Sequence, residues 1–179
     1  MRRLLLALGS AVGVFFIAAT AVLGCGDKFV VLGRGVRFQR VYTAAHPASI
    51  LIYMNPASHM PAAEREYQLQ AILKLAGHKA SIVEDASELP KALSAKNYDL
   101  VIADVSDATA LQREAGAAAS KPSVIPLVYN PTGAELKAAE KQYSCLVQAS
   151  KKNHQLLAVI DEAMLGKLKG TGVQCASTK

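Results

Sequence analysis

The feature that most constrains the fold of this chain is a regular alternation of short apolar runs with helical segments. Five runs are short and apolar, as buried strands are: residues 49–53, 80–84, 98–103, 123–129 and 144–148. Five other segments have helical spacing or helix-end signals: residues 61–76, 87–95, 108–119, 133–142 and a last helix that starts at Asn153. Such an alternation with short connections predicts a parallel sheet with helices on both faces.

The topology of such a sheet has few solutions because crossover connections between parallel strands are right-handed. We therefore predict an α/β protein with a three-layer, flavodoxin-like sandwich around a five-stranded parallel sheet. Any binding site is expected outside the carboxyl ends of the strands. The last helix is expected to bury one apolar face, made of Leu156, Leu157, Val159, Ile160, Ala163, Met164 and Leu168.

The cysteine and histidine residues give no metal-binding pattern. His46, His59, His78 and His154 are scattered, and no cysteine lies at ligand spacing from them, so we predict neither a zinc site nor a bound cofactor. His78 follows Gly77 at a helix end and is expected to face solvent. Cys145 lies in an apolar run and Cys175 in a polar tail, so a buried free thiol at Cys145 is favoured over a disulfide between them.

The first 24 residues form a separate segment that points to a membrane. Arg2 and Arg3 precede an uncharged apolar stretch over residues 4–23, which has the length of either an anchor helix or a cleaved leader. The residues Val22-Leu23-Gly24-Cys25 resemble the lipoprotein box of bacteria, and this resemblance implies acylation of Cys25. An uncleaved anchor is the alternative, and both place the domain on the non-cytoplasmic side of a membrane in the cell envelope.

The charges divide the chain further. Residues 25–48 carry Lys28, Arg34, Arg37 and Arg40 and are interpreted as a basic tether, and residues 167–179 as a polar tail. The domain between them, residues 49–166, is close to neutral although the whole chain carries a net charge of +6. The sequence shows no basic face interleaved with aromatic residues, so nucleic acid is not expected as a partner.

The order of residues in this domain resembles the receiver domains of bacterial response regulators. The stretch Tyr98-Asp99-Leu100-Val101-Ile102-Ala103-Asp104-Val105 is similar to their third strand, which ends in the aspartate that accepts a phosphoryl group. The stretches 73–89, 123–128 and 145–148 are similar to the neighbouring elements. The resemblance covers residues 49–166 and implies Asp104 as the phosphoacceptor position.

The resemblance also implies that the receiver site is degenerate. Met54 and Asn55 stand where receivers have two acids that hold Mg²⁺, and Gln148 stands where they have a lysine. The hydroxyl-bearing position falls at Val128 or Tyr129. Phosphoryl transfer depends on a metal ion and a cation that neutralise developing charge, so we expect no catalysis and no metal here. Asp104 is expected to accept hydrogen bonds from backbone N–H groups instead.

These expectations leave three functions open. The favoured one is a membrane-tethered, non-catalytic domain that acts through contacts with an unidentified envelope protein, with residues 133–166 as the contact surface. A phosphorylatable receiver with Asp104 as acceptor is the second. A small-ligand module that uses the strand ends near Asn55, Asp104 and Asn130 is the third.

Overall fold

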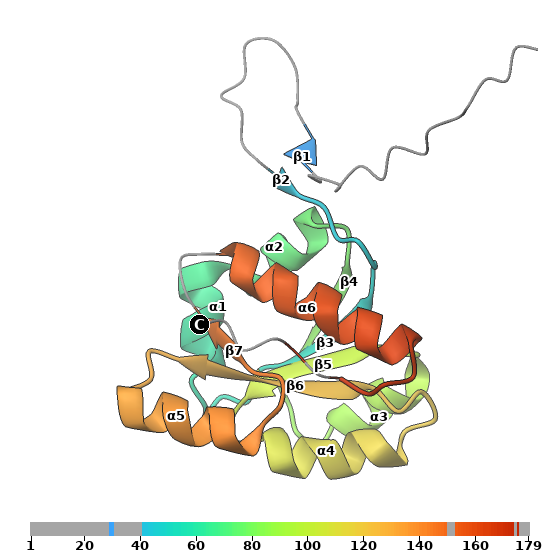
Figure 1. Cartoon of the computed structure of the whole chain (residues 1–179). Helices are drawn as coiled ribbons and strands as arrows, with labels where there is room; N and C mark the ends of the chain where they lie inside the picture. The colour runs from blue at the N-terminus through green and yellow to red at the C-terminus, as the bar shows by residue number, and fades with distance from the viewer. Residues whose placement is uncertain (1–28, 31–40, 150–152, 174, 176–179) are drawn as a thin grey trace, which may run out of the picture.

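The architecture follows from a computed structural model, which describes residues 29–30, 41–149, 153–173 and 175 (Figure 1). The leader, Cys25 and most of the basic tether lie outside the described residues. The described elements are, in chain order, β1 (Phe29–Val30), β2 (Val41–Tyr42), β3 (Ser49–Tyr53), α1 (Met60–Tyr67), α2 (Leu69–Leu75), β4 (Lys79–Val83), α3 (Leu89–Ala95), β5 (Leu100–Asp104), α4 (Ala108–Ala117), β6 (Ser123–Tyr129), α5 (Gly133–Gln142), β7 (Val147–Ala149) and α6 (Asn153–Leu168).

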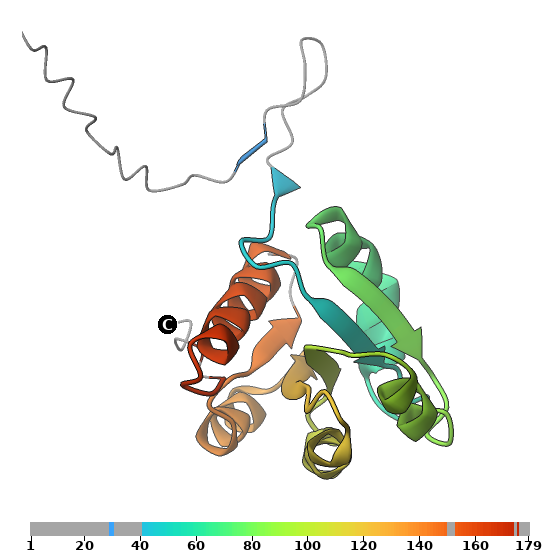
Figure 2. The ribbon, with the colours of Figure 1, turned by 90° about the vertical axis from the view of Figure 1, so that its right-hand side faces the viewer.

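The main sheet confirms the predicted fold class. Its five strands are all parallel and stand in the order β4-β3-β5-β6-β7. Counted within this sheet, the order is 2-1-3-4-5, which is that of flavodoxin-like folds. The short strands β1 and β2 pair antiparallel in a separate two-stranded sheet. The protein is therefore a three-layer α/β sandwich, with α1, α2 and α6 on one face of the sheet and α3, α4 and α5 on the other (Figures 1 and 2).

The alternation of side chains along the strands creates two apolar cores. Ile50 and Ile52 of β3 point into a core shared with α1, α2 and α6, whereas Leu51 and Tyr53 point into a core shared with α3 and α4. Every residue of β5 is buried, as expected for a central strand covered on both faces. Burial on both faces explains why the apolar runs in the sequence are continuous rather than alternating.

Pro126 is tolerated inside β6 because of where it lies in the ladder. The carbonyl of Leu127 accepts a hydrogen bond from Val105 on the β5 side, so the neighbouring Pro126 nitrogen is directed toward β7. Pairing with β7 begins only at Leu127, opposite Val147. The N–H that proline lacks therefore has no ladder partner to lose.

The segment 61–76 was predicted as one helix and is two. Gln68 has a left-handed backbone, with φ of 50°, and it separates α1 from α2. The carboxylate of Glu64 accepts the N–H of Gln70 at 3.1 Å, which satisfies a donor in the first turn of α2. The break lets Met60 and Ala63 of α1 and Leu69 and Leu73 of α2 all reach the same core.

The prediction that His78 faces solvent is wrong. Only 4% of its surface is exposed, and its Nδ1 accepts the N–H of Ala48 at 3.1 Å. Gly77 has φ of 99°, and the N–H groups of Gly77 and His78 bond to the carbonyls of Lys74 and Leu73. This pattern is a Schellman motif, in which the residue after the glycine turns back onto the helix, and it explains the burial.

The prediction of a free buried thiol at Cys145 is also wrong, because Cys145 forms a disulfide with Cys175. Cys145 is buried, as expected, but the polar tail turns back and brings Cys175 to it. The N–H of Thr171 bonds to the carbonyl of Gly166, and the hydroxyl of Ser144 donates to the carbonyl of Val173. The last helix ends with Leu168 66% exposed, so this residue does not belong to the buried face.

The residues just before β3 are packed onto the domain. We call residues 42–48 the strap. The carboxylate of Asp161 in α6 accepts the hydroxyl of Tyr42 and the N–H groups of Ala45 and His46. The N–H of Ala44 bonds to the carbonyl of Ala76. The end of the segment predicted as a tether is thus part of the folded domain.

We expect Asp161→Ala to lower the free energy of unfolding by about 4 kcal/mol or more, because it removes three hydrogen bonds to a charged acceptor and each contributes about 1.5–3 kcal/mol. Tyr42→Phe removes only one of these bonds and should have a smaller effect. Asp161→Asn keeps one oxygen for the backbone donors and should fall between the two. Urea denaturation of the three variants and the wild type measures the order, and equal stability of Asp161→Ala and wild type would contradict it.

His78 is expected to make stability depend on pH. Burial lowers the pKa of its ring below the ordinary value of 6.5, and the charge of Asp161 opposes this shift. The unfolded chain therefore takes up a proton at higher pH than the folded protein does. The free energy of unfolding should be constant above about pH 7.5 for this group and should decrease as the pH falls below about 6.5.

Urea denaturation of His78→Gln and wild type between about pH 5 and pH 8 tests this dependence. The glutamine variant retains a hydrogen-bond acceptor for the Ala48 N–H but does not titrate, so its curve should be flatter than that of the wild type. His154 is exposed in α6, and His154→Gln is the matched control. A slope that persists in His78→Gln would assign the dependence to other groups.

Candidate functional site

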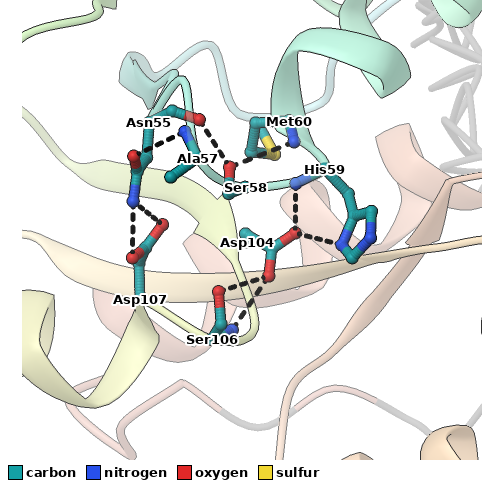
Figure 3. Close-up of polar contacts among 8 residues, drawn as sticks. All are labelled: Asn55, Ala57, Ser58, His59, Met60, Asp104, Ser106 and Asp107. Carbon is teal, nitrogen blue, oxygen red and sulfur yellow. Dashed lines mark hydrogen bonds and ion pairs between the residues drawn. The ribbon is translucent and has the colours of Figure 1, made fainter.

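Polar side chains gather where β3 and β5 end, at the carboxyl edge of the sheet (Figure 3). Asn55 follows β3, His59 immediately precedes α1, and Asp104 is the last residue of β5. Ser106 and Asp107 lie in the turn between β5 and α4. Because β3 and β5 are hydrogen-bonded neighbours, their carboxyl ends place these side chains together, as predicted for this fold.

Asp104 is a buried carboxylate whose two oxygens both accept hydrogen bonds. Its side chain is 3% exposed. Oδ1 accepts the backbone N–H of Ser106 at 2.9 Å and the Ser106 hydroxyl at 2.8 Å. Oδ2 accepts the backbone N–H of His59 at 3.2 Å, and the Nδ1 atom of the His59 ring lies 3.5 Å from it. The expectation that Asp104 meets backbone N–H groups agrees with this geometry.

Asn55 is held away from Asp104 by a second set of contacts. Its amide nitrogen donates to both carboxylate oxygens of Asp107, at 2.9 and 3.1 Å. Its side-chain oxygen accepts the N–H of Ala57, and its backbone carbonyl accepts the hydroxyl of Ser58. The amide is therefore used to fix the loop between β3 and α1 against the loop after β5.

His59 and Tyr129 form the exposed border of this site. The His59 side chain is 74% exposed, and its ring stacks on that of Tyr129 with centroids 6.4 Å apart. The Tyr129 hydroxyl donates to Glu66 in α1 at 2.7 Å, and this bond to a carboxylate raises the pKa of Tyr129 above its ordinary value of 10.0. Tyr129 thus joins the end of β6 to α1.

Two other positions that the receiver resemblance singles out, Met54 and Gln148, lie outside this cluster. Met54 is 6% exposed and packs in the core beneath α1 and α2. Gln148 is exposed on β7, opposite Val128 of β6. Asn55 and Tyr129 therefore border the Asp104 cluster, whereas Met54 lies in the apolar core and Gln148 on the exposed side of β7.

These residues do not fit a magnesium ion. Mg²⁺ needs free carboxylate oxygens in octahedral arrangement with water. The oxygens of Asp104 face three hydrogen-bond donors, and both oxygens of Asp107 face the Asn55 amide nitrogen. Across the described parts of the chain, no group of three or more His, Cys, Asp or Glu side chains is arranged to hold a metal.

The sequence pattern missed three members of this site, namely His59, Ser106 and Asp107. A signal for Ser106 and Asp107 was available in the sequence. They belong to an Asp-x-Ser-Asp stretch after a buried strand, and such residues often bond to nearby backbone N–H groups. The contact between His59 and Asp104 had no such signal. It joins positions 45 residues apart in the chain, and only the packing of α1 over the sheet brings them together.

A shallow pocket of about 310 Å³ lies beside this site and is lined by Tyr53, Asn55, Pro56, Glu84, Asp85 and Ala86. Burial and the charge of Asp107 raise the pKa of Tyr53 above its ordinary value of 10.0. The pocket offers the carboxylates of Glu84 and Asp85 to solvent, whereas Tyr53 is only 6% exposed.

Two further observations bear on location and family. Within the described part of the chain, no helix has the length and apolar character needed to cross a membrane. Comparison of the chain with protein-family models, with curated proteins and with solved structures gives no match.

Proposed function

We propose that this chain is a membrane-tethered, non-catalytic receiver-like domain that acts through protein contacts in the cell envelope. The observation that carries the proposal is the hydrogen bonding of the Asp104 carboxylate. Both of its oxygens accept hydrogen bonds from donors of the domain itself, and the other acid of the cluster, Asp107, is bound by the Asn55 amide. No lysine of the described cluster supplies the cation that phosphoryl transfer needs. A carboxylate whose oxygens are already hydrogen-bonded within the domain favours a protein that acts through surface contacts over one that catalyses a reaction.

The disulfide and the leader supply independent support for the location. Disulfides persist in oxidising compartments outside the cytoplasm and are rare inside it. The bond between Cys145 and Cys175 therefore fits the position that the basic N-terminus and the Gly24-Cys25 pair predict for the domain. Several acyl chains at Cys25 would give a stable anchor, whereas one chain would not.

Incubation of the purified chain with acetyl phosphate and Mg²⁺ tests the absence of phosphorylation. We expect no mass increase of about 80 Da, the mass of one phosphoryl group. An adduct in the wild type that is absent from Asp104→Asn would overturn the proposal and establish the phosphorylatable receiver. Asp107→Asn is the matched control, because it changes a neighbouring carboxylate in the same turn.

The contact surface that we propose comprises residues 133–166, which include α5, β7 and most of α6. Hydrogen exchange of the chain alone and with a co-purified envelope protein tests it. Slower exchange in α5 and in the described part of α6 supports this surface. Unchanged exchange there with protection elsewhere would reject it.

The pocket beside Asn55 favours a second candidate, a module that binds a small cationic or hydroxyl-bearing ligand at the carboxyl edge. Glu84 and Asp85 line it, and ligands bind at this edge in folds of this class. A thermal-shift screen of small cationic and polyhydroxylated envelope metabolites tests the candidate, because a ligand that binds only the folded state raises the melting temperature. Loss of the shift in Asp85→Asn would assign it to this pocket.

A further inference from the structure

The amino edge of the main sheet, opposite Asp104, collects lysine side chains. Lysines lie in the last turns of helices, in the connections or at the strand starts of this edge, and beyond the end of α6: Lys74, Lys79, Lys96, Lys121, Lys141, Lys167 and Lys169. All of these are exposed except Lys167, whose Nζ donates to the carbonyl of Asp99 at 2.9 Å. The acids at this edge are Asp99, Glu114, Glu140, Asp161 and Glu162. Asp99 accepts the N–H of Ser49 and lies 3.9 Å from the Lys167 ammonium, and Asp161 accepts the N–H groups of the strap.

The loops at the carboxyl edge of the sheet, in contrast, carry mainly acidic side chains. Its loops and helix starts carry Glu84, Asp85, Glu88, Asp104, Asp107 and Glu135. Lys91, in the first turn of α3, also lies there. Among the described residues, lysines therefore outnumber acids at the amino edge, and acids outnumber basic side chains at the carboxyl edge. Acids at helix N-termini and bases at helix C-termini stabilise helices, which explains part of this distribution.

The exposed leucines are not explained by helix stability. Among the described residues, the large apolar side chains that are exposed are Leu75, Leu165 and Leu168, with 71%, 38% and 66% of their surfaces in solvent. They belong to the last turns of α2 and α6, both of which end at the amino edge. Apolar side chains among lysines are the composition of surfaces that lie on membranes.

The direction of the chain brings the N-terminal segment to the same edge. β2 ends at Tyr42, and the strap then leads to the start of β3 (Figure 1). In that view the strap reaches the right-hand end of the sheet, where α6 also ends. Asp161 fixes the strap to α6, so Tyr42, at the start of the strap, is held beside α6 near the amino edge.

We propose that the amino edge docks onto the anionic surface of the membrane that holds the N-terminus. The docking surface consists of the seven lysines named above together with Leu75, Leu165 and Leu168. Phospholipid phosphates attract the lysines, and the leucines enter the interface between headgroups and acyl chains. The acidic carboxyl edge then faces away from the membrane. The inference rests on the proposed tether for its orientation, and it adds the surface that the membrane contacts.

A bilayer fits this surface better than another polyanion does. A nucleic acid or an acidic protein segment would neutralise the lysines and leave exposed leucines in water. A bilayer interface accepts both kinds of side chain. Each lysine near an anionic surface contributes an interaction that corresponds to roughly a fivefold change in the docking equilibrium at moderate ionic strength.

The chain contains no tryptophan, which allows a direct test with the full chain. Leu168→Trp places a single indole on the docking surface while keeping a large apolar side chain. Ala134→Trp places it on an exposed position at the start of α5, near the carboxyl edge, and is the matched control. Both variants are reconstituted into vesicles of phosphatidylcholine alone and of phosphatidylcholine with about one third phosphatidylglycerol, an anionic content like that of charged leaflets.

We expect the emission of Leu168→Trp to shift to shorter wavelength, and to be quenched by brominated lipid, only in the anionic vesicles. The emission of Ala134→Trp should be the same in both. High salt should reverse the shift because it screens exposed charges. Replacement of Lys96, Lys121 and Lys169 by glutamine in the Leu168→Trp chain should weaken docking roughly a hundredfold, whereas Lys137→Gln on α5 should leave it unchanged.

Flotation of the same samples separates this inference from the proposed tether. A chain that floats with both kinds of vesicle but shows no lipid-dependent shift of Leu168→Trp keeps the tether and overturns the docking surface. A chain that floats only with anionic vesicles keeps the docking surface and overturns the tether. Flotation with neither overturns both. A shift caused by an added oligonucleotide in neutral vesicles, stronger than that caused by anionic lipid, would reassign the surface to a polyanion and overturn the proposal.

Discussion

Reduction of the Cys145–Cys175 disulfide is expected to lower the free energy of unfolding by about 3.5 kcal/mol. The bond closes a loop between residues separated by 30 positions, and in the chain-entropy account a loop of that size restricts the unfolded chain by about this amount. The reduced protein also loses the constraint that holds the tail over β7. Few single changes elsewhere in the domain are expected to have so large an effect.

Urea denaturation with and without a reductant measures this loss. The double variant Cys145→Ala/Cys175→Ala should have the lower stability of the reduced protein and should not respond to the reductant. Cys25→Ala retains the disulfide and is the matched control, so it should respond as the wild type does. A wild-type protein whose stability is the same in both conditions would show that the bond contributes nothing.

Asp104→Ala is expected to destabilise the domain by about 3 kcal/mol. The change leaves the N–H groups of His59 and Ser106 and the Ser106 hydroxyl without their acceptor at a partly buried site. A buried donor that loses its partner costs about 1–3 kcal/mol, and groups bonded to a charge cost more. Asp104→Asn retains one acceptor oxygen and should lose roughly half as much.

Thermal and urea denaturation measure this effect, with Glu88→Gln as the control for removing an exposed acid at the same edge. A stable Asp104→Ala protein, within about 0.5 kcal/mol of the wild type, would mean that the carboxylate is not a structural acceptor. Together with the acetyl phosphate experiment, the result separates a structural role of Asp104 from a chemical one.

The parts of the fold that the sequence predicted are those governed by local pattern. The apolar runs gave β3 and β6 at their observed bounds and the other strands of the sheet within one to three residues. Thr132 and Glu135 form the capping box that begins α5, a short-range arrangement visible in the residues themselves. Connection length predicted the parallel sheet, and the right-handedness of crossovers restricted its topology to a few solutions.

The parts that the sequence did not predict depend on where an element packs. Gln68 breaks a segment whose helical spacing is otherwise regular, because two shorter helices bury their apolar residues better than one long helix. The burial of His78 depends both on a local motif and on tertiary packing. The Schellman motif at Gly77 is local, but only the strap supplies the Ala48 N–H that the ring accepts.

What the sequence by itself determined is the fold class, because the apolar runs and helical segments depend on residue types at given positions. The leader and the loss of receiver chemistry stay predictions of the same kind. The tertiary structure alone decided the partners of Asp104, the pairing of Cys145 with Cys175 and the gathering of lysines and leucines at one edge. Those contacts join residues that are far apart in the chain. Burial, shared acceptors and surface charge arise only when the packed elements bring such residues to the same place.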